Sequence, residues 1–336
     1  MSELRRDPIV GRWVIINTDH PLGPNDFEKE DQSAKQAAVC QFCSGRESQT
    51  PGEVESIRLN GSLPNTAGWS LRVVPNKFPA LQVEGEIDKR GIGIFDMAKG
   101  IGAHEVVIET PDHHKNLADF SDQEILSVIK TYQSRLITLA KDKRFKYIMI
   151  FKNYGESAGA SLEHAHTQIL ALPLVPKYVL EELEGAQYYY EYRGRCVFCD
   201  MIEQEYQDKK RIITENNDFI SFAPFVPRFP FESWIIPKKH GFEFCSLAQE
   251  GRHNLAMILR EVLYRMKKCL SDPSYNFYLH LAPLNNAYQD SYHWHIEIIP
   301  KLTRVAGFEW GTGFYVVETE PGVAAQHLRE VVYSGV

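Results

Sequence analysis

The sequence predicts an α+β fold made of two tandem repeats, each a mostly antiparallel sheet that carries one major helix. Two observations support this prediction. Cysteine and histidine residues of the kind that bind metals recur in the same order in both halves of the chain, and strand and helix signals recur in the same order around them. The length of 336 residues suffices for about two domains of ordinary size.

The recurring motif is a CxxC pair, then a single histidine, then a His-x-His triplet. The first half supplies Cys40, Cys43, His113, His164 and His166, and the second half supplies Cys196, Cys199, His240, His293 and His295. The single histidine and the triplet are 51 residues apart in the first half and 53 residues apart in the second. The spacing from the CxxC pair to the single histidine differs by an insertion. The matched interval indicates a duplication.

Secondary-structure signals occur in the same order in both halves. A strand precedes each single histidine, at residues 105–109 and 233–236. A long helix comes next; the first begins at the capping box Ser121-Asp122-Gln123-Glu124, and the second covers roughly 247–269. A further strand succeeds the helix, and the triplet then opens a last strand, which gives strands at 147–151, 276–280, 167–172 and 296–299.

These signals divide the chain into two domains. We expect an N-terminal catalytic domain at residues 1–185 and a C-terminal domain at residues 186–336. The join is expected near 176–195, where an acidic segment and a tyrosine-rich segment lead up to Cys196.

Composition excludes several classes of partner. The net charge is −7, and basic residues occur only in short pairs, whereas nucleic-acid and membrane-surface partners need a concentrated basic face. The N-terminal segment 1–7 lacks the apolar core of a signal peptide, and no apolar run approaches the length that spans a bilayer. We therefore expect no nucleic acid, no membrane and a cytosolic location. In that compartment CxxC pairs favour metal binding or redox chemistry over structural disulfides.

Each half contains a full set of ligands for a tetrahedral zinc ion, because a CxxC turn supplies two thiolates and two histidines complete the set. The first set is Cys40, Cys43, His113 and His164, and the second is Cys196, Cys199, His240 and His293. His114 is a rival of His113, but the alignment of the repeats favours His113. The alternative is that these are chance cysteines and core histidines. Since protein fills all four positions, we expect two structural zinc ions per chain and no water-activating metal.

The segment 159–168 contains the candidate nucleophile. Alternate residues of an extended segment share a face, so His164, His166 and Gln168 lie together. A zinc ion on His164 would hold His166 rigidly two residues along. A neutral imidazole with one nitrogen hydrogen-bonded to the backbone presents the other nitrogen as a nucleophile. The alternative is that His166 is only a satisfied polar residue.

Neighbouring residues suit a phosphate substrate. Gln168 is an uncharged donor that can hold a phosphoryl oxygen, and Ser161, although off-phase, can also donate to phosphate. Gly159 permits close approach of the backbone.

At these residues the sequence closely resembles the galactose-1-phosphate uridylyltransferases, the transferase branch of the histidine-triad (HIT) superfamily, over nearly their whole length. The matching segments are Arg5–Pro8, Gly11–Val14, Cys40–Cys43, Arg72–Pro79, His104–Val107, Asn153–Gln168, Tyr292–His295 and Ala306–Gly313. The resemblance implies two HIT-like repeats.

The resemblance also implies a ping-pong reaction. His166 attacks the α-phosphorus of UDP-glucose, releases glucose 1-phosphate and forms uridylyl-His166, and galactose 1-phosphate then takes the uridylyl group. It makes Gln168 a holder of the transferred phosphate. It implies substrate contacts for Asn153, Gly159 and Ser161, and it places Asn76 and Phe78 near the nucleoside.

A homodimer is a further expectation from the resemblance. The partner's loop around Gly311, Thr312, Gly313 and Phe314 would complete the sugar-phosphate site. A plain β-turn is the alternative for this glycine-bracketed segment.

Two departures from the family pattern stand out. In the second repeat Glu297 replaces the glutamine two residues after the histidine, and its carboxylate would repel a phosphoryl oxygen, so we interpret this half as catalytically silent. Between Asn17 and Asp26 the family usually carries an Arg-x-x-Arg-Pro motif, whereas this sequence has His20 and Gly23 there. Their absence leaves nucleotide affinity open.

Three other functions remain open. The ADP-glucose phosphorylases share the CxxC pairs and the His-x-His-x-Gln core, and they transfer an adenylyl group to inorganic phosphate. A nucleotide-binding protein without turnover is motivated by the missing arginines. A hydrolase of the same superfamily is weaker, because Gln168 stands where hydrolases carry a general-acid histidine.

Overall fold

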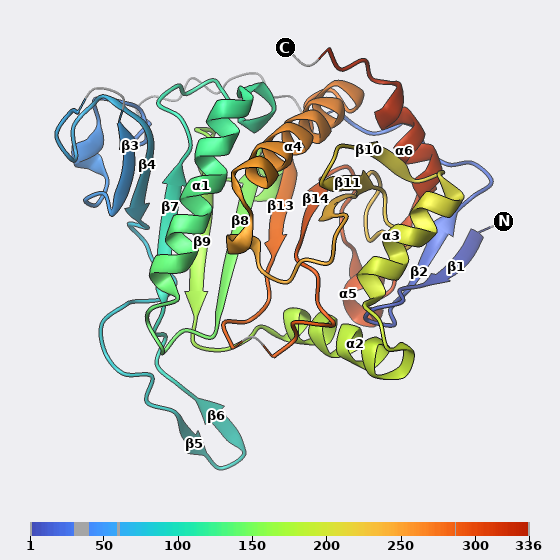
Figure 1. Ribbon diagram of the computed structural model, residues 1–336, viewed down its shortest axis with the longest axis horizontal. Helices are drawn as coiled ribbons and strands as arrows, with labels where there is room; N and C mark the ends of the chain where they lie inside the picture. Colours follow the sequence, from blue (N-terminus) through green and yellow to red (C-terminus); the bar gives the residue numbers. More distant parts are fainter. Residues whose placement is uncertain (1, 30–39, 59–60, 286, 335–336) are drawn as a thin grey trace.

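The computed structural model describes residues 2–29, 40–58, 61–285 and 287–334. Its centre is one antiparallel sheet of ten strands (Figure 1). From one edge to the other, the strands are β10 (Ile212–Glu215), β11 (Phe219–Phe222), β12 (Ser233–Pro237), β14 (His295–Pro300), β13 (Tyr275–His280), β8 (Tyr147–Tyr154), β9 (His166–Leu172), β7 (Ala103–Ile108), β4 (Trp69–Pro75) and β3 (Glu55–Arg58).

Each half of the chain contributes five neighbouring strands in the same spatial order. Reading from the edges inward, β3, β4, β7, β9 and β8 correspond to β10, β11, β12, β14 and β13. The two half-sheets join at their innermost strands, which pair antiparallel from Ile150 with Leu279 to Tyr154 with Tyr275. We call this β8–β13 pairing the seam. The α+β class and the tandem repeats are thereby confirmed.

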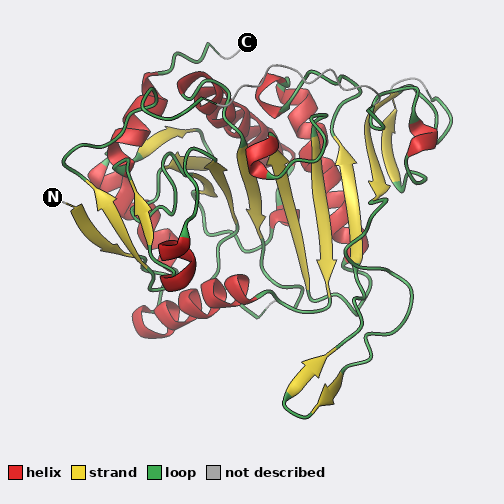
Figure 2. Ribbon diagram, turned by 180° about the vertical axis from the view of Figure 1, so that it is seen from behind, coloured by secondary structure: helices red, strands yellow, loops and turns green. Residues whose placement is uncertain are grey.

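One long helix of each repeat covers the same face of the sheet. α1 (Asp122–Leu139) and α4 (Gln249–Cys269) pack against each other over the seam, as Figures 1 and 2 show from opposite sides. The predicted capping box is present: the Ser121 hydroxyl accepts from Glu124 N–H, and the Glu124 carboxylate accepts from Ser121 N–H. The predicted helices and strands of both repeats are present, with shifts of three residues or fewer at their ends.

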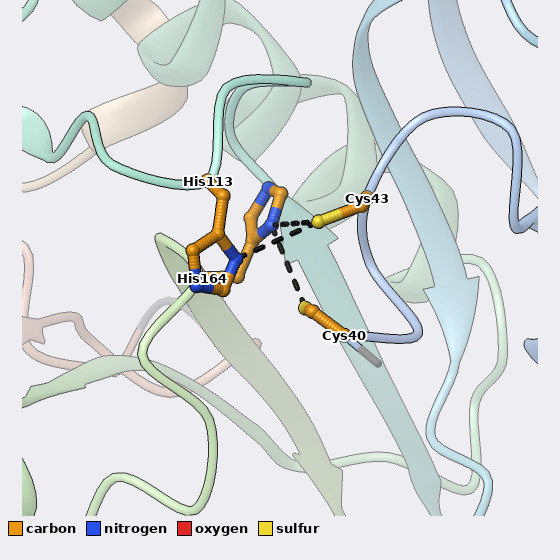
Figure 3. Close-up of side chains that lie close together, drawn as sticks. All are labelled: Cys40, Cys43, His113 and His164. Atoms are coloured by element: carbon orange, nitrogen blue, oxygen red, sulfur yellow. Dashed lines mark hydrogen bonds between the residues drawn. The ribbon is translucent and has the colours of Figure 1, made fainter. Parts of the chain in front are cut away.

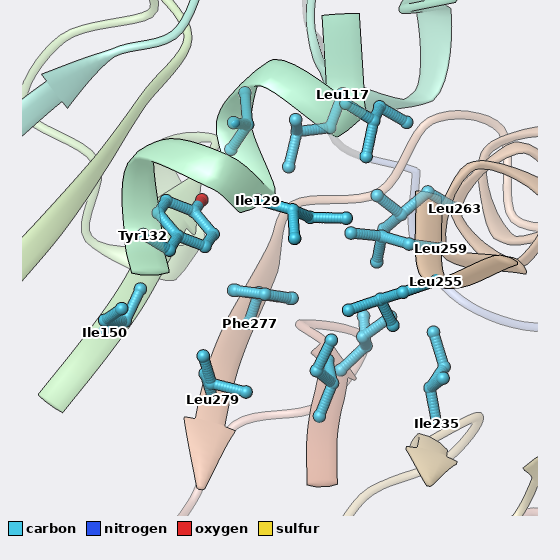
Figure 4. Close-up of a cluster of buried hydrophobic side chains, with 14 of the residues drawn as sticks. Leu117, Ile129, Tyr132, Ile150, Ile235, Leu255, Leu259, Leu263, Phe277 and Leu279 are labelled. Atoms are coloured by element: carbon cyan, nitrogen blue, oxygen red, sulfur yellow. The ribbon is translucent and has the colours of Figure 1, made fainter. Parts of the chain in front are cut away.

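The main hydrophobic core lies between these helices and the seam (Figure 4). Ile129 of α1 and Leu255 and Leu259 of α4 face Phe277 of β13, and all four side chains are buried. Burying a side chain of this size contributes roughly 1.5–3 kcal/mol, so the two repeats are held together by their core as well as by strand pairing.

Smaller elements surround the sheet. A second sheet contains β1 (Ser2–Arg6), β2 (Trp13–Asn17) and β15 (Tyr315–Val317), and the hairpin of β5 (Arg90–Ile92) and β6 (Phe95–Met97) projects from the body (Figure 1). The remaining helices are α2 (Lys177–Arg193), α3 (Val197–Asp208), α5 (Gly307–Thr312), α6 (Pro321–Glu330) and the 3₁₀ turns η1 (Glu47–Gln49), η2 (Leu117–Asp119), η3 (Glu156–Ala158) and η4 (Phe244–Ser246). None of the helices in the described residues is both long enough and apolar enough to cross a membrane.

Two segments singled out in the sequence are helical. The expected join near 176–195 is one continuous helix, α2, which ends at Gly194 in the left-handed conformation. The expected loop at 311–314 is instead the end of α5: Gly311 and Thr312 are helical, and Gly313 is the left-handed C-cap with φ of 72°. The reason is the Glu309 carboxylate, which accepts from Ala306 N–H and so caps the start of a short helix.

Candidate active site and metal groups

The first Cys₂His₂ group comes together at the top of β9 (Figure 3). Cys43 Sγ lies 3.5 Å from His113 Nδ1 and 3.7 Å from His164 Nδ1, and Cys40 Sγ also lies 3.7 Å from His164 Nδ1. A tetrahedral zinc ion with ordinary bond lengths would separate sulfur and nitrogen ligands by about 3.6 Å. The donor set and its spacing therefore fit a metal ion, and His114 does not belong to the group.

Hydrogen bonds hold the residues of this group in positions that suit metal binding. The CxxC turn is closed by a hydrogen bond from Cys43 N–H to Cys40 O at 3.3 Å. His164 Nε2 lies 2.7 Å from the carbonyl oxygen of Thr110, so this nitrogen carries the hydrogen and Nδ1 keeps a free lone pair. In metal sites, a hydrogen bond donated by the ring nitrogen that does not bind the metal orients the histidine ligand.

The second group repeats the arrangement in the C-terminal half. Cys199 Sγ lies 3.5 Å from His240 Nδ1 and 3.8 Å from His293 Nδ1, and Cys196 completes a set whose ligand atoms all lie within 4.8 Å of one another. His240 Nε2 lies 2.8 Å from Gln289 O, which leaves Nδ1 free as in the first group. The structure thus gathers both predicted sets.

His166 is the first residue of β9 and is buried. Its Nδ1 lies 2.8 Å from the carbonyl oxygen of His164, so Nδ1 carries the hydrogen and Nε2 keeps its lone pair. Burial, and after it the ammonium of Lys152, lower the pKa of His166 and favour the neutral ring. Lys152 Nζ donates to His166 O at 3.0 Å and pairs with Glu109 at 2.7 Å, so a buried ion pair fixes the backbone of His166.

A cavity of about 310 Å³ opens beside His166. Its lining contains five of the predicted site residues, namely Asn76, Phe78, Ser161, His166 and Gln168. Phe78 is 81% exposed, so its ring is free to cover a ligand. A histidine nitrogen with a lone pair, neutral donors and an aromatic ring therefore line one cavity, a combination that suits a ligand with both polar and planar parts.

Other predicted residues lie outside this lining. Asn153 and Gly159 lie next to each other, since a Cβ built on Gly159 would be 3.9 Å from Asn153 Nδ2. Among the described residues that line the cavity, none comes from α5, so Gly311, Thr312 and Gly313 take no part in the cavity of their own chain.

The residues of the segment without the expected arginines are also absent from the cavity lining. His20 and Gly23 flank Leu22, whose N–H donates to Glu318 O at 2.8 Å, and Gly23 N–H donates to the Asp26 carboxylate. The segment is therefore packed against the C-terminal part of the chain.

Charged side chains surround the corresponding histidine of the second repeat, His295. His280 Nδ1 lies 3.1 Å from Glu182, and its Nε2 lies 3.0 Å from Glu297, which also pairs with Arg228. Burial alone would lower the pKa of His280, but these two carboxylates raise it to about 10. Glu182, His280 and His295 bring their polar atoms within 4.8 Å of one another, a cluster that the sequence reasoning missed.

Two residues of the active half were also missed as site residues. His104 on β7 contacts Gln168, and Lys152 on β8 contacts His166. The alternation of β7 places His104 on the face of Val106, which pairs with Gln168, so strand register could have indicated it. A lysine at the end of an apolar strand gives no such signal, because lysine is ordinarily solvent-exposed.

The fold and the site together give a two-repeat protein in which His166 lines a cavity beside a Cys₂His₂ group. Residues 2–176 match the family described as galactose-1-phosphate uridyl transferase, N-terminal domain, and residues 177–312 match the corresponding C-terminal domain. The chain belongs to this family of transferases.

Relatives of both expected kinds are similar over almost the whole chain. An ADP-glucose phosphorylase of Arabidopsis thaliana is 38% identical over 98% of this chain and 93% of its own length. A galactose-1-phosphate uridylyltransferase of Thermotoga maritima is 28% identical over 98% of both chains. The crystal structure of an Arabidopsis thaliana ADP-glucose phosphorylase with bound ADP-glucose superposes with a TM-score of 0.83 at 36% identity, covering 99% of this chain and 100% of that chain.

Proposed function

We propose that this protein transfers a nucleoside monophosphate group from a nucleotide sugar through a covalent nucleotidyl-His166 intermediate. The observation that carries the proposal is the position of His166: its Nδ1 donates to the His164 carbonyl, its Nε2 therefore keeps a lone pair, and the ring lines the same cavity as Gln168. This is the arrangement that nucleophilic catalysis by a neutral imidazole requires.

The chemistry balances in two half-reactions. His166 Nε2 forms a bond to the α-phosphorus while the bond from that phosphorus to the bridging oxygen breaks, and the sugar 1-phosphate leaves. A phosphate oxygen of the second substrate then forms a bond to the same phosphorus, and the bond to Nε2 breaks. Gln168 and Ser161, both in the cavity lining, are placed to donate to the phosphoryl oxygens.

Two zinc ions per chain belong to the proposal. Cys40, Cys43, His113 and His164 would hold one, and the second Cys₂His₂ group would hold the other. Each ion would supply structural rigidity, and in the first group this rigidity would extend to His166 through the chain.

The proposed substrates are UDP-glucose and galactose 1-phosphate, as the family resemblance implies. A second candidate is transfer of adenylyl from ADP-glucose to phosphate. It is favoured by the higher identity to the ADP-glucose phosphorylase, 38% against 28% for the uridylyltransferase of Thermotoga maritima. Both nucleotide-sugar donors, UDP-glucose and ADP-glucose, are proposals for this chain.

The proposal extends to assembly and location. We place the protein in the cytosol, where thiols stay reduced and can bind zinc. We also propose a homodimer in which the partner's α5, with Gly311, Thr312 and Gly313, completes the sugar-phosphate site. This assignment suits the absence of α5 from the described lining of its own chain's cavity. A fully active monomer at micromolar concentration would contradict it.

The deciding experiment is intact-protein mass spectrometry after mixing the protein with UDP-glucose or with ADP-glucose alone. One added uridylyl or adenylyl group per chain supports the mechanism, and its mass identifies the nucleotide. Normal turnover without an adduct from either donor would overturn the assignment of His166. Ligand-induced thermal stabilisation with neither adduct nor turnover would indicate a binding protein.

A further inference from the structure

His104 lies behind the cavity and does not line it, yet it contacts two residues that do. Its Nε2 lies 2.8 Å from Gln168 Oε1 and 3.1 Å from Asn76 Nδ2. Its Nδ1 lies 3.2 Å from the backbone nitrogen of Ala80. Both ring nitrogens are therefore engaged by groups whose donor or acceptor character is known.

These contacts fix the position of the hydrogen on the ring. The Ala80 N–H can only donate, so Nδ1 accepts and the hydrogen resides on Nε2. Nε2–H then donates to Gln168 Oε1, since a carbonyl oxygen can only accept. Asn76 Oδ1 accepts from the Phe78 N–H at 2.9 Å, so Asn76 Nδ2 faces the ring; with the hydrogen on Nε2 both of these nitrogens are donors, and no hydrogen bond joins them.

The hydrogen bond from His104 decides which end of the Gln168 amide is available. Because Oε1 is occupied, the NH₂ group is the end that remains to meet a ligand. A phosphoryl oxygen only accepts hydrogen bonds, so an amide turned by 180° would present an oxygen to it and repel it. The orientation of Gln168 therefore matters as much as its presence.

We propose that His104 is a positioning residue that holds the Gln168 amide with its NH₂ group toward the transferred phosphoryl group. The inference rests on the proposed transfer through His166 and adds to that site a residue that acts through Gln168. It assigns His104 no contact with substrate.

The silent repeat offers an internal comparison. Gln168 pairs with Val106 in the first repeat, and Glu297 pairs with Trp234 in the second. The residue two positions before that partner is His104 in the first case and Glu232 in the second. Glu232 hydrogen-bonds to Glu297, and burial followed by the charge of Glu297 raises its pKa to about 8. Both repeats thus place a donor at this position, but only the first pairs it with an amide.

The test compares three variants in the first half-reaction. His104→Phe keeps a ring of similar size and lacks the donor, so we expect adduct formation to slow about 10- to 100-fold, with KM for the nucleotide sugar changed less than about threefold. His104→Gln restores a donor and should recover most of the rate. His253→Gln, at an exposed position of α4, is the matched control and should leave the rate unchanged.

A double-mutant cycle shows whether His104 acts through Gln168. If it does, His104→Phe has no further effect on the rate in the Gln168→Ala background. If the fold-reductions in rate of the two single variants multiply in the double variant, the inference is overturned.

A separate measurement keeps this result distinct from a failure of the proposed function. Nitrogen NMR of histidine-labelled, ligand-free protein should show the hydrogen of His104 on Nε2, and Gln168→Ala should shift that signal. A hydrogen on Nδ1, or a signal unmoved by Gln168→Ala, would overturn the inference whether or not an adduct forms on His166.

Discussion

Asn276 of the second repeat donates a hydrogen bond of 2.9 Å from its Nδ2 to Oδ1 of Asn153 in the first repeat. The two residues are partners across the seam. The same Nδ2 donates to Ala158 O at 2.9 Å, next to Gly159. With Oδ1 engaged, Asn153 has its NH₂ group available to a ligand. The second repeat therefore orients a predicted phosphate contact of the first.

Replacing Asn276 with Ala should lower the rate of nucleotidyl transfer about tenfold, because Asn153 and the turn before Gly159 lose their support. Asn216→Ala is the control within the second repeat: it removes a side-chain bond to Asn254 O and the acceptor of bonds from the Asp218 and Phe219 N–H groups. Each variant should lose about 1–3 kcal/mol of unfolding free energy, measured in urea. Equal rates in the two variants would contradict a link across the seam.

His166→Gly should abolish transfer and leave folding and metal content intact, because His166 is not among the proposed ligands. His164→Gly should lose the first metal ion and stability, because it removes a ligand and its bond to Thr110. Metal analysis and thermal unfolding on both variants separate the two roles. A His166→Gly variant that still transferred the nucleotidyl group would refute the assignment of His166 as the nucleophile.

Zinc content should be two per chain, by elemental analysis of protein purified without chelators. Cys196→Ser should halve it, and because the second group lies in the silent repeat, the adduct on His166 should still form in whatever fraction stays folded. One metal ion or none in the wild type would remove the second site from the proposal.

The half-buried His280 should make stability depend on alkaline pH. Its pKa of about 10 lies above the value near 6.5 of an unfolded histidine. Its stabilising contribution is therefore fully present below about pH 6.5 and is lost as the pH rises through about 10. His280→Gln should accordingly lose less unfolding free energy than the wild type between pH 7 and pH 10. Parallel pH curves for the two proteins would contradict a charged His280.

Residue spacing alone predicts both metal groups and the catalytic face. The CxxC pairs and the histidines at matched intervals identify the metal groups, and the alternation of His164, His166 and Gln168 identifies the face. The edge-to-edge pairing of the two half-sheets was not predictable, because the sequences of β8 and β13 have the pattern of ordinary buried strands. Lys152 and Glu182 were missed for a related reason. Lys152 is buried and Glu182 is half-buried, and each is accommodated by a partner distant in sequence, Glu109 for one and His280 for the other.

The seam also has a consequence for how the protein responds to dilution. Two separate copies of a single repeat could pair through the same inner strand only at a sufficient concentration, whereas tethering in one chain makes that pairing intramolecular. The sheet of the active half therefore persists at any dilution. The tethered copy can therefore depart from the first repeat, as it does with Glu297 at the position of Gln168, provided that it keeps its strands and the Asn276 contact.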